Sequence, residues 1–289
     1  MKANGPLKSS SPRILISPRA RRAVNARGLD ASQIQGTGPN GRIVDTDVAA
    51  FSAPPKSASP ALPKLSVMRQ TIARRTAESF STAPHFYLRT ELDADALLEC
   101  RAGWLESVEK ECGVRLTLTD LILKAMALAL RDRPKFRRIW EGGTIRSMES
   151  VDIGLVVGLE DGLMIPILRN VDRLSLADLA RQRSQLTEAA RKGTLSAEQT
   201  QGGSITLSNL GHSVVDDFAA VLPPPHSAIL AVGRVVPRPF VDQGKLCARP
   251  TIKMCLSVDH RVLDGAPAAD YLGRLAELIA KPLPLSEAA

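Results

Sequence analysis

The apolar residues of this chain recur at intervals that predict where its main helices lie. In residues 117–133 (TLTDLILKAMALALRDR) they cover most faces of a helix, which is typical of a helix buried on nearly all sides. Residues 174–192 are amphipathic and end at Gly193, a residue that suits the position after a helix C-terminus. We also predict a helix at about 66–80 and a closing helix at about 265–279.

Shorter apolar runs predict strands between these helices. They are bounded by turn residues and lie at 151–159, 163–168, 205–208, 228–232 and 251–258. The first two are separated by Glu160-Asp161-Gly162, which we expect to form a turn. The segment PHFYLRTELD is expected to be extended as well. Strands and helices mixed in this way predict one α/β domain.

A separate small module is predicted near the N-terminus by its helix boundary signals. Ser17 suits a helix N-cap, Pro18 the first helical position and Gly28 the left-handed residue after the helix. The glycine-rich loop GTGPNG and a short helix at about 46–51 follow. We therefore divide the chain into a linker at 1–12, the small module at 13–51, a Pro/Ala-rich linker at 52–64 and the main domain at 65–289.

Composition is that of an ordinary globular protein, with 44 % hydrophobic and 24 % charged residues among 289. No apolar run approaches the roughly 18 residues of a membrane span, and the N-terminus has no secretory signal pattern. We therefore expect a cytoplasmic protein without a membrane partner. The four cysteines form no C-x-x-C pair and have no histidine at ligand spacing, so we expect reduced packing residues and no metal site.

The net charge of +8 is concentrated in the small module, because residues 1–50 contain eight basic and three acidic residues. Such a basic module binds an acidic protein surface or nucleic acid. Nucleic-acid modules often use aromatic residues for stacking, and Phe51 is the only aromatic residue before position 80. We expect a protein partner and no nucleic acid, the alternative being a solvated basic face. The predicted contact residues include Arg19, Arg21, Arg22 and Arg42.

The segment DHRVLDGA (259–266) contains the strongest candidate for catalysis. An apolar strand ends at His260, whose ordinary pKa near neutrality allows it to take a proton from a thiol or hydroxyl group at pH 7. Asp264 can anchor the turn or cap the next helix, and Gly265 is expected to let the backbone bend sharply. The alternative is a structural histidine at a strand end, which this dense motif disfavours.

A second candidate lies in GGSITLSNLG (202–211). Ser208 ends a predicted strand, where its hydroxyl can donate to the oxyanion of a tetrahedral intermediate. It could instead be a nucleophile, although the sequence is not a G-x-S-x-G elbow, or belong to a Ser-Asn turn. The loop GTGPNG matches G-x-G-x-x-G, but no apolar strand precedes it, so we reject a dinucleotide site.

Taken together, these motifs resemble a known enzyme family. DHRVLDGA, SITLSNLG, PPPHSAILAVG and RRTAESFSTAPHFYLRTELD look like the catalytic domain of the dihydrolipoamide acyltransferase component of 2-oxo-acid dehydrogenase complexes, over about 67–285. SPRARRAVNARGLDASQIQGTGPNGRIVDTDV is similar to that family's peripheral subunit-binding domain, which docks the other enzymes of the complex. Within the family, SNLG followed by DDFAAV and AILAVG looks most like the pyruvate branch, the acetyltransferase.

The resemblance implies a chloramphenicol-acetyltransferase-like α/β (α+β) fold, with a mixed sheet and flanking helices, preceded by a small all-α module. It implies a homotrimer, packed further into a hollow cubic or dodecahedral core, with the active site between subunits. His260 would deprotonate the attacking thiol, Ser208 of a neighbouring subunit would hold the oxyanion, and Asp264 would support the turn. CoA and a dihydrolipoamide arm would be the substrates.

The same resemblance implies the partners of residues 13–51, namely dihydrolipoamide dehydrogenase, the 2-oxo-acid decarboxylase component, or both. A lipoyl domain would be a further partner. No lysine lies in the D-K-A setting of a lipoylation hairpin, so either the chain is truncated or another polypeptide supplies the lipoyl group in trans. Val214 stands where the family commonly has glycine, and His212 lies close to the expected site, as a lining residue or a substrate contact.

Two other functions compete with the active core acyltransferase. One is a non-catalytic docking scaffold, which the missing lipoylation site favours and the retained His260 disfavours. The other is a stand-alone CoA-dependent acyltransferase that uses a different acyl acceptor.

Overall fold

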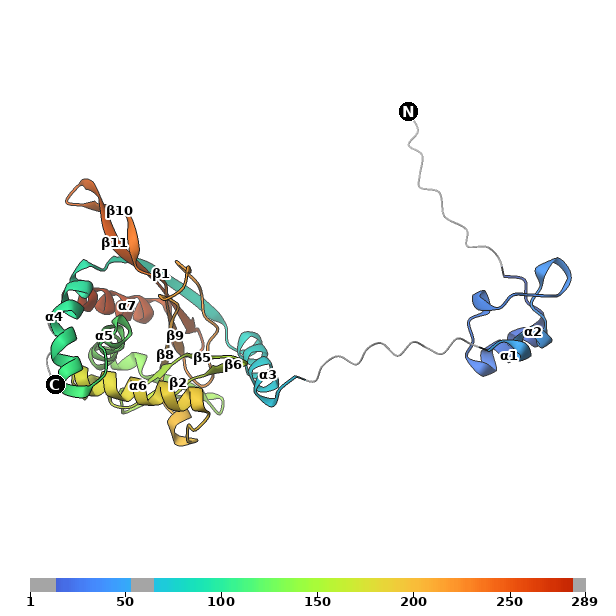
Figure 1. Cartoon of the computed structure of the whole chain (residues 1–289), viewed down its shortest axis with the longest axis horizontal. Helices are drawn as coiled ribbons and strands as arrows, with labels where there is room; N and C mark the ends of the chain where they lie inside the picture. Colours follow the sequence, from blue (N-terminus) through green and yellow to red (C-terminus); the bar gives the residue numbers. More distant parts are fainter. Residues whose placement is uncertain (1–13, 53–64, 283–289) are drawn as a thin grey trace, which may run out of the picture. The chain divides into compact units, whose positions relative to one another are not determined.

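The computed structural model describes residues 14–52 and 65–282, and it divides the chain into two compact units, residues 1–64 and 65–289. Figure 1 shows both units, which are described separately. The predicted linker at 1–12 and all but the first residue of the linker at 52–64 lie outside the described residues. None of the described helices combines the length and apolar character that crossing a bilayer requires.

The first unit contains two short helices, α1 (Pro18–Arg27) and α2 (Asp45–Ala50), with 3-10 turns at Ala31–Gln33 and Pro39–Gly41 between them. The predicted boundaries of α1 are confirmed: Ser17 Oγ accepts from the Ala20 N–H at 3.1 Å, and Gly28 is left-handed with φ 62°. Its core consists of five buried side chains, Ala20, Val24, Ile34, Ile43 and Val48.

Asp47 closes the glycine-rich loop of this unit. Its carboxylate accepts hydrogen bonds from the Thr37 N–H and hydroxyl and from the Val44 N–H, at 3.0, 2.6 and 2.9 Å. These bonds, led by that from the Thr37 hydroxyl, lower the pKa of Asp47. The loop that resembles a phosphate-binding motif is therefore bonded to a carboxylate of its own unit.

The second unit is built on a seven-stranded mixed sheet, in the order β1-β11-β9-β8-β4-β7, with β10 paired to β11. Strands β4, β8 and β9 run parallel, and the other pairs are antiparallel. The strand bounds are β1 His85–Asp93, β4 Ile153–Leu155, β7 Ile167–Leu168, β8 Ile205–Asn209, β9 Ala228–Val232, β10 Val236–Asp242 and β11 Lys245–Asp259. The predicted mixed sheet is confirmed.

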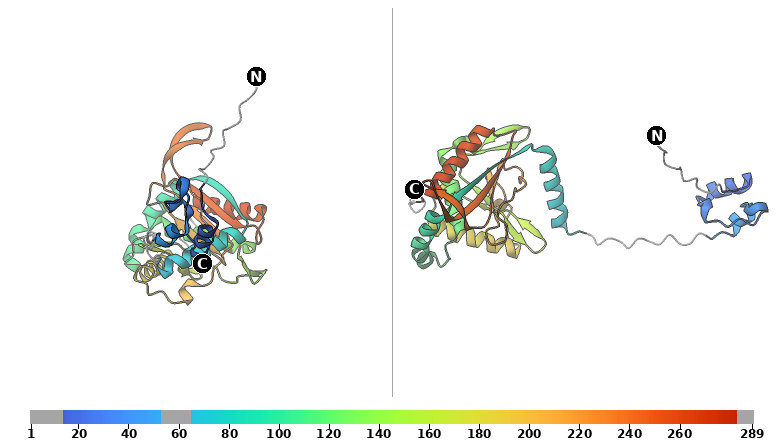
Figure 2. Two further views of the ribbon diagram at one scale, coloured as in Figure 1. Left: turned by 90° about the vertical axis from the view of Figure 1, so that its right-hand side faces the viewer. Right: turned by 90° about the horizontal axis from the view of Figure 1, so that it is seen from above.

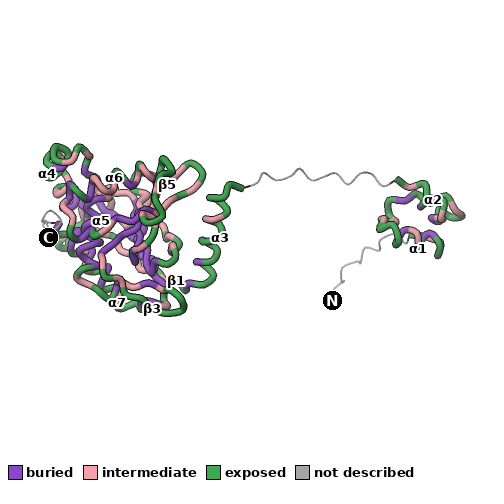
Figure 3. Tube along the Cα trace, turned by 90° about the horizontal axis from the view of Figure 1, so that it is seen from below, coloured by how far each residue is buried: buried purple, intermediate pink, exposed green. Residues whose placement is uncertain are grey.

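Four helices pack together against this sheet: α4 (Asp95–Cys112), α5 (Leu118–Asp132), α6 (Leu176–Lys192) and α7 (Gly265–Ala280). Their buried apolar side chains and those of β8, β9 and β11 form one continuous core. Helix α5 lies at its centre and is buried from residue 120 to 130, as its sequence predicts (Figure 3). Helix α3 (Val67–Thr82) instead lies at the edge of the unit (Figure 2), where it contacts β6 (Gly162–Met164). It is exposed along most of its length (Figure 3).

The prediction of two continuous strands at 151–159 and 163–168 is wrong, because each is divided into two shorter strands. The segment forms one hairpin in a single register, but β4 and β7 belong to the main sheet, whereas β5 (Val157–Leu159) and β6 (Gly162–Met164) form a separate pair. Pro166 lies at the interruption and has no N–H to donate to the ladder. Val156 instead donates its N–H to the Leu207 carbonyl of β8, at 2.9 Å.

The sequence patterns did not predict two further antiparallel pairings. Strands β2 (Arg138–Glu141) and β3 (Thr144–Ser147) pair with each other, and β11 begins at Lys245 instead of residue 251 because it first pairs with β10. The β10–β11 ribbon extends beyond the main sheet (Figure 1). Its polar, proline-containing sequence lacks the apolar alternation that marks the inner strands.

Gly154 of β4 lies where the sheet is too crowded for a side chain. A Cβ there would lie 2.8 Å from Thr206 Oγ1, 2.9 Å from Ile165 Cγ2 and 3.0 Å from His226 Cε1. We expect Gly154→Ala to lower the free energy of unfolding by about 1–3 kcal/mol, because the packed neighbours must shift. Urea denaturation of the full chain measures the change.

Gly158, four residues later in β5, provides the control, because no atom lies within 4 Å of its added Cβ. Gly158→Ala should leave the urea midpoint nearly unchanged. Equal destabilisation by both substitutions would show that the crowding at Gly154 is not the cause.

Candidate active site

His260 directly follows the last residue of β11 and is held by the start of β1. Its backbone N–H donates to the Pro84 carbonyl at 2.9 Å, next to the Asp259–His85 pair of the two strands. The imidazole packs against the Phe86 ring, with 4.7 Å between the ring centroids. About half of the side chain, 52 %, stays exposed. The segment PHF therefore positions the histidine and leaves it accessible to a substrate.

The Asp264 carboxylate lies beside His260 and does not cap the helix. Its Oδ1 is 3.6 Å from His260 Nδ1, and Asp264 precedes α7 without a side-chain hydrogen bond to the helix. At this distance the carboxylate lies on the Nδ1 side of the ring without a hydrogen bond to it, and 82 % of the Asp264 side chain is exposed. Asp264 occupies the predicted N-cap position, but its side chain makes no capping hydrogen bond, and its support of the turn stays a prediction.

The sharp bend predicted at Gly265 is also wrong. Gly265 is the first residue of α7, its φ is not positive, and a Cβ there would meet no atom within 4 Å. The chain reverses earlier, where the Val262 and Leu263 N–H groups both donate to the Asp259 carbonyl, at 3.0 and 3.1 Å.

The two residues that flank His260, Asp259 and Arg261, form an ion pair that stiffens this turn. Asp259 is buried, and its carboxylate accepts from Arg261 Nη2 at 2.7 Å and from Arg261 Nε at 3.0 Å. The Arg261 guanidinium also lies over the Trp140 ring, 5.0 Å from its centroid. Neither residue was among the predicted site residues, although the charged pair that flanks the histidine in D-H-R is a signal visible in the sequence.

Ser208 does not meet His260 within one chain. In the sheet, Ser208 pairs with Ala231 of β9, and Ala231 pairs with Cys255 of β11. Cys255 precedes His260 by five residues, so the two backbones are separated by roughly 17 Å along the strands and roughly 10 Å across them. Ser208 and His260 therefore lie toward opposite ends of the sheet, and one site that uses both needs a second copy of the chain.

The residues after Ser208 form the polar turn that the sequence suggested. Asn209 Nδ2 donates to Thr119 Oγ1 at 3.0 Å, and Asn209 Oδ1 accepts from the Gly211 N–H at 2.7 Å. Asn209 therefore makes the local turn bonds. Further along, His212 and Val214 are both exposed.

The other two histidines of the main unit are fully engaged in structural hydrogen bonds. Gly202 O can only accept, so His226 Nε2 donates to it at 2.7 Å, and Nδ1 accepts from the Thr206 hydroxyl at 2.6 Å. Burial lowers the pKa of His226 to about 4. His85 likewise donates from Nδ1 to Ala83 O and accepts at Nε2 from the Leu222 N–H. These contacts leave neither ring a free nitrogen for proton transfer.

In the first unit, the four arginines predicted to bind a partner are all exposed. Arg19 lies 3.3 Å from the Asp45 carboxylate, with 86 % of its side chain exposed. Arg27 behaves differently, because it donates to the carbonyls of Val48 and Phe51 and so ties α1 to the end of α2. The exposed set comprises Arg19, Arg21, Arg22 and Arg42.

Sequence comparison places both units in known families. The profile of the 2-oxoacid dehydrogenases acyltransferase (catalytic domain) matches residues 59–286. This chain belongs to that acyltransferase family. The e3 binding domain profile matches residues 14–49 of the acyltransferase. The resemblance inferred from its motifs is confirmed.

Among its relatives, the acyltransferase is 35 % identical to the dihydrolipoyllysine-residue acetyltransferase component of the pyruvate dehydrogenase complex of Zymomonas mobilis, over 94 % of this chain and 66 % of that protein. It is 36 % identical to the mitochondrial counterpart of Schizosaccharomyces pombe, over 94 % of this chain and 61 % of that protein. The chain therefore spans less than two thirds of the length of these curated relatives.

Solved structures resemble the main unit of the acyltransferase. One is the dihydrolipoamide acetyltransferase of Azotobacter vinelandii, studied for the role of a serine, a histidine and an asparagine in its catalytic mechanism. It has a TM-score of 0.74 and 32 % identity, over 81 % of this chain and 98 % of that one. Another, the cubic core of a pyruvate dehydrogenase multienzyme complex, has a TM-score of 0.73 and 32 % identity, over 81 % and 99 %. The fold is that of these acyltransferase cores.

His226 should make folding stability depend on pH. The folded chain holds the neutral ring with a pKa of about 4, whereas the unfolded chain has the ordinary value of 6.5. Its contribution is therefore complete above about pH 6.5 and falls by roughly 3 kcal/mol as the pH drops to 4. Urea unfolding across this range measures the slope.

His226→Gln removes the titrating ring and should flatten this slope, whereas His212→Gln, at an exposed position, should retain it. An unchanged slope in His226→Gln would assign the pH dependence to other groups.

Proposed function

We propose that this chain transfers an acetyl group from dihydrolipoamide to CoA, as the core acyltransferase of a pyruvate dehydrogenase complex. The observation that carries the proposal is the His260 turn. Of the four histidines of the main unit, His85 and His226 are engaged in structural hydrogen bonds, whereas His212 and His260 are accessible. His260 is half exposed, with Asp264 on its Nδ1 side. This arrangement suits a general base that works through Nε2.

In this reaction, Nε2 of His260 takes the proton of the CoA thiol as its sulfur attacks the thioester carbonyl. The carbonyl oxygen becomes an oxyanion, which the Ser208 hydroxyl stabilises by donating a hydrogen bond. The carbon–sulfur bond to dihydrolipoamide then breaks, and the leaving thiolate recovers the proton from His260. One thioester replaces another, so no group is oxidised or reduced. CoA and the lipoyl group, carried by a separate domain, are substrates.

We propose that His260 of one chain works with Ser208 of another, in a homotrimer. The positions of the two residues toward opposite ends of the sheet support this arrangement. The β10–β11 ribbon supports it as well, since Val241 and Leu246 are 66 % and 76 % exposed there and would be covered by a neighbouring copy. Likeness to a cubic core supports packing of such trimers into a cubic or dodecahedral shell.

Residue spacing in the Azotobacter relative supports the same assignment. The serine and histidine named for its catalytic mechanism are 52 positions apart, and its asparagine follows the histidine by four. Ser208, His260 and Asp264 have the same two spacings. The position of Asp264 thus holds an amide in that protein and a carboxylate here.

Mixed oligomers test the shared site directly. His260→Ala should lower the rate of acetyl transfer by about 10²–10⁴-fold. Ser208→Ala should lower it by about 10²–10³-fold. Refolded together in equal amounts, the two inactive chains should regain about a quarter of the wild-type rate, because random mixing pairs an intact histidine with an intact serine at one interface in four.

Glu106→Ala is the control, because Glu106 is an exposed residue of α4 outside the proposed chemistry, and it should keep full activity. Mixtures that stay inactive, although mass analysis shows mixed trimers, would contradict the shared site. Full activity of His260→Ala in a reconstituted complex would favour a docking role instead.

For the first unit, residues 13–51, we propose docking of dihydrolipoamide dehydrogenase, the decarboxylase component, or both, in the cytoplasm. The match to an e3 binding domain supports this proposal, as do the exposed arginines on one small basic unit. The acidic partner surface would contact Arg19, Arg21, Arg22 and Arg42.

Affinity for dihydrolipoamide dehydrogenase should therefore fall steeply as salt is raised, because surface charges are screened. Arg22→Gln should weaken binding at low salt, whereas Arg22→Lys, which keeps the charge, should weaken it less. Calorimetric titration of the full chain measures both. Affinity that is independent of salt and unaffected by Arg22→Gln would contradict this contact surface.

A further inference from the structure

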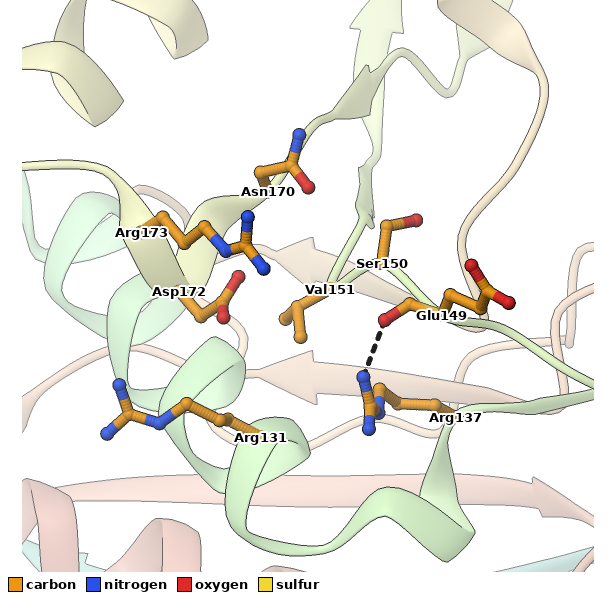
Figure 4. A pocket seen from close by; sticks show the side chains of 8 residues that line it. All are labelled: Arg131, Arg137, Glu149, Ser150, Val151, Asn170, Asp172 and Arg173. Atoms are coloured by element: carbon orange, nitrogen blue, oxygen red, sulfur yellow. Dashed lines mark hydrogen bonds between the residues drawn. The ribbon is translucent and has the colours of Figure 1, made fainter. Parts of the chain in front are cut away.

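A pocket of about 410 Å³ opens in the main unit between four segments of the chain. It is lined by residues from the end of α5, the start of the β2 hairpin, the stretch before β4 and the turn after β7 (Figure 4). Neither His260 nor Asp264 nor Ser208 lines it, so it is separate from the groups proposed for acetyl transfer. Its lining includes three arginines, Arg131, Arg137 and Arg173.

Arg137 is held in place from one side. Its Nη1 donates to the Glu149 carbonyl at 2.6 Å, which directs the guanidinium along the pocket wall (Figure 4). Its Nε is buried and has no hydrogen-bond partner among the described residues. A buried donor of a charged group that lacks an acceptor is unfavourable. The positive charge of Arg137 is therefore not fully compensated by the protein around it.

The other two arginines of the pocket, Arg131 and Arg173, also lack a close carboxylate partner among the described residues. Arg131 has one carboxylate near it, Asp132, at the long distance of 3.7 Å. Arg173 makes no ion pair or side-chain hydrogen bond with any residue that the structure describes. Most other arginines around the main sheet are paired, as Arg249 is with both Asp95 and Asp242 at 2.7 Å. Arg173 is exposed, so its guanidinium is open to solvent and to an anion from outside the chain.

The carboxylate in the pocket does not cancel this charge. Asp172 is buried, and the ammonium of Lys124 donates to the backbone carbonyls of Asp172 and Leu174, at 2.8 and 2.7 Å. Lys124 is thus a buried cation behind the pocket wall, held by backbone carbonyls and without an ion pair to the Asp172 carboxylate. Three arginines and two acidic residues, Asp172 and Glu149, therefore line the cavity, which leaves one positive charge in excess.

Asn170 supplies a polar group on a rigid backbone. It is one of three described residues other than glycine with a positive φ, at 50°, and its N–H donates to Asp152 Oδ1 at 2.9 Å. Asp152 is itself buried and paired with Arg169 at 2.7 Å. The amide side chain of Asn170 lines the pocket close to Arg173 (Figure 4). Left-handed backbone at a non-glycine residue persists only where the surroundings enforce it.

We propose that this pocket binds a small phosphate-bearing anion. Guanidinium groups form paired hydrogen bonds to phosphate oxygens, and three of them suit the double negative charge of a phosphate better than a single carboxylate. A cavity of about 410 Å³ has the size of a small-ligand site, which accommodates pyrophosphate or the phosphate end of a metabolite.

Calorimetric titration of the full chain with inorganic phosphate and with pyrophosphate tests the proposal. Both should bind saturably, pyrophosphate more tightly, and acetate should not bind. Arg173→Gln should weaken pyrophosphate binding about tenfold or more, since a charged hydrogen-bond donor is lost. Arg191→Gln removes an exposed arginine of α6 from another part of the surface, so it should change the affinity less than about twofold.

Arg173 is the preferred site for substitution because the described fold does not use its side chain. The melting temperature of Arg173→Gln without ligand should equal that of the wild type, whereas Arg137→Gln would also lose the bond to Glu149. Absence of saturable phosphate and pyrophosphate binding would overturn the proposal. Equal weakening by Arg173→Gln and Arg191→Gln would also overturn it, since general charge would then explain the affinity.

Discussion

The ion pair of Asp259 and Arg261 is the constraint on which the candidate site depends. A buried carboxylate is strongly unfavourable unless a cation and donors compensate it, and here the compensating cation is two residues away in the same turn. The backbone of Asp259 does as much as its side chain. Its N–H donates to Ser227 O at 2.8 Å, and its carbonyl accepts from Val262 and Leu263. Asp259 therefore joins the end of β11 to Ser227, directly before β9, and to the turn that precedes α7.

Between these two charged residues, His260 has little freedom of its own. Its N–H is bound to the first strand, its ring contacts Phe86, and the backbone on both sides is hydrogen-bonded. The ring can therefore remain half exposed without becoming mobile. Such fixed geometry suits the proposed role of His260 as a general base, because less orientation has to be established when the substrate binds.

The antiparallel course of β11 has a second consequence, which concerns assembly. Because β11 runs against β8 and β9, it places His260 near the end where those strands begin, while Ser208 lies near the end where they finish. Chemistry that needs both side chains is then a property of the assembled copies. Under the proposed shared site, enzyme activity and oligomer stability are linked, since any change that weakens the interface between copies also removes the site.

The sequence by itself determined those features that depend on neighbours along the chain. The limits of α1, the burial of α5 and the motif around His260 could all be read from caps, periodicity and spacing, which act within a few residues. Only the tertiary structure decided the break of the hairpin at Pro166, the position of Asp264 beside His260, and the distance of Ser208 from it. These depend on strand register and on contacts between residues far apart in the sequence, and local patterns do not encode such pairings.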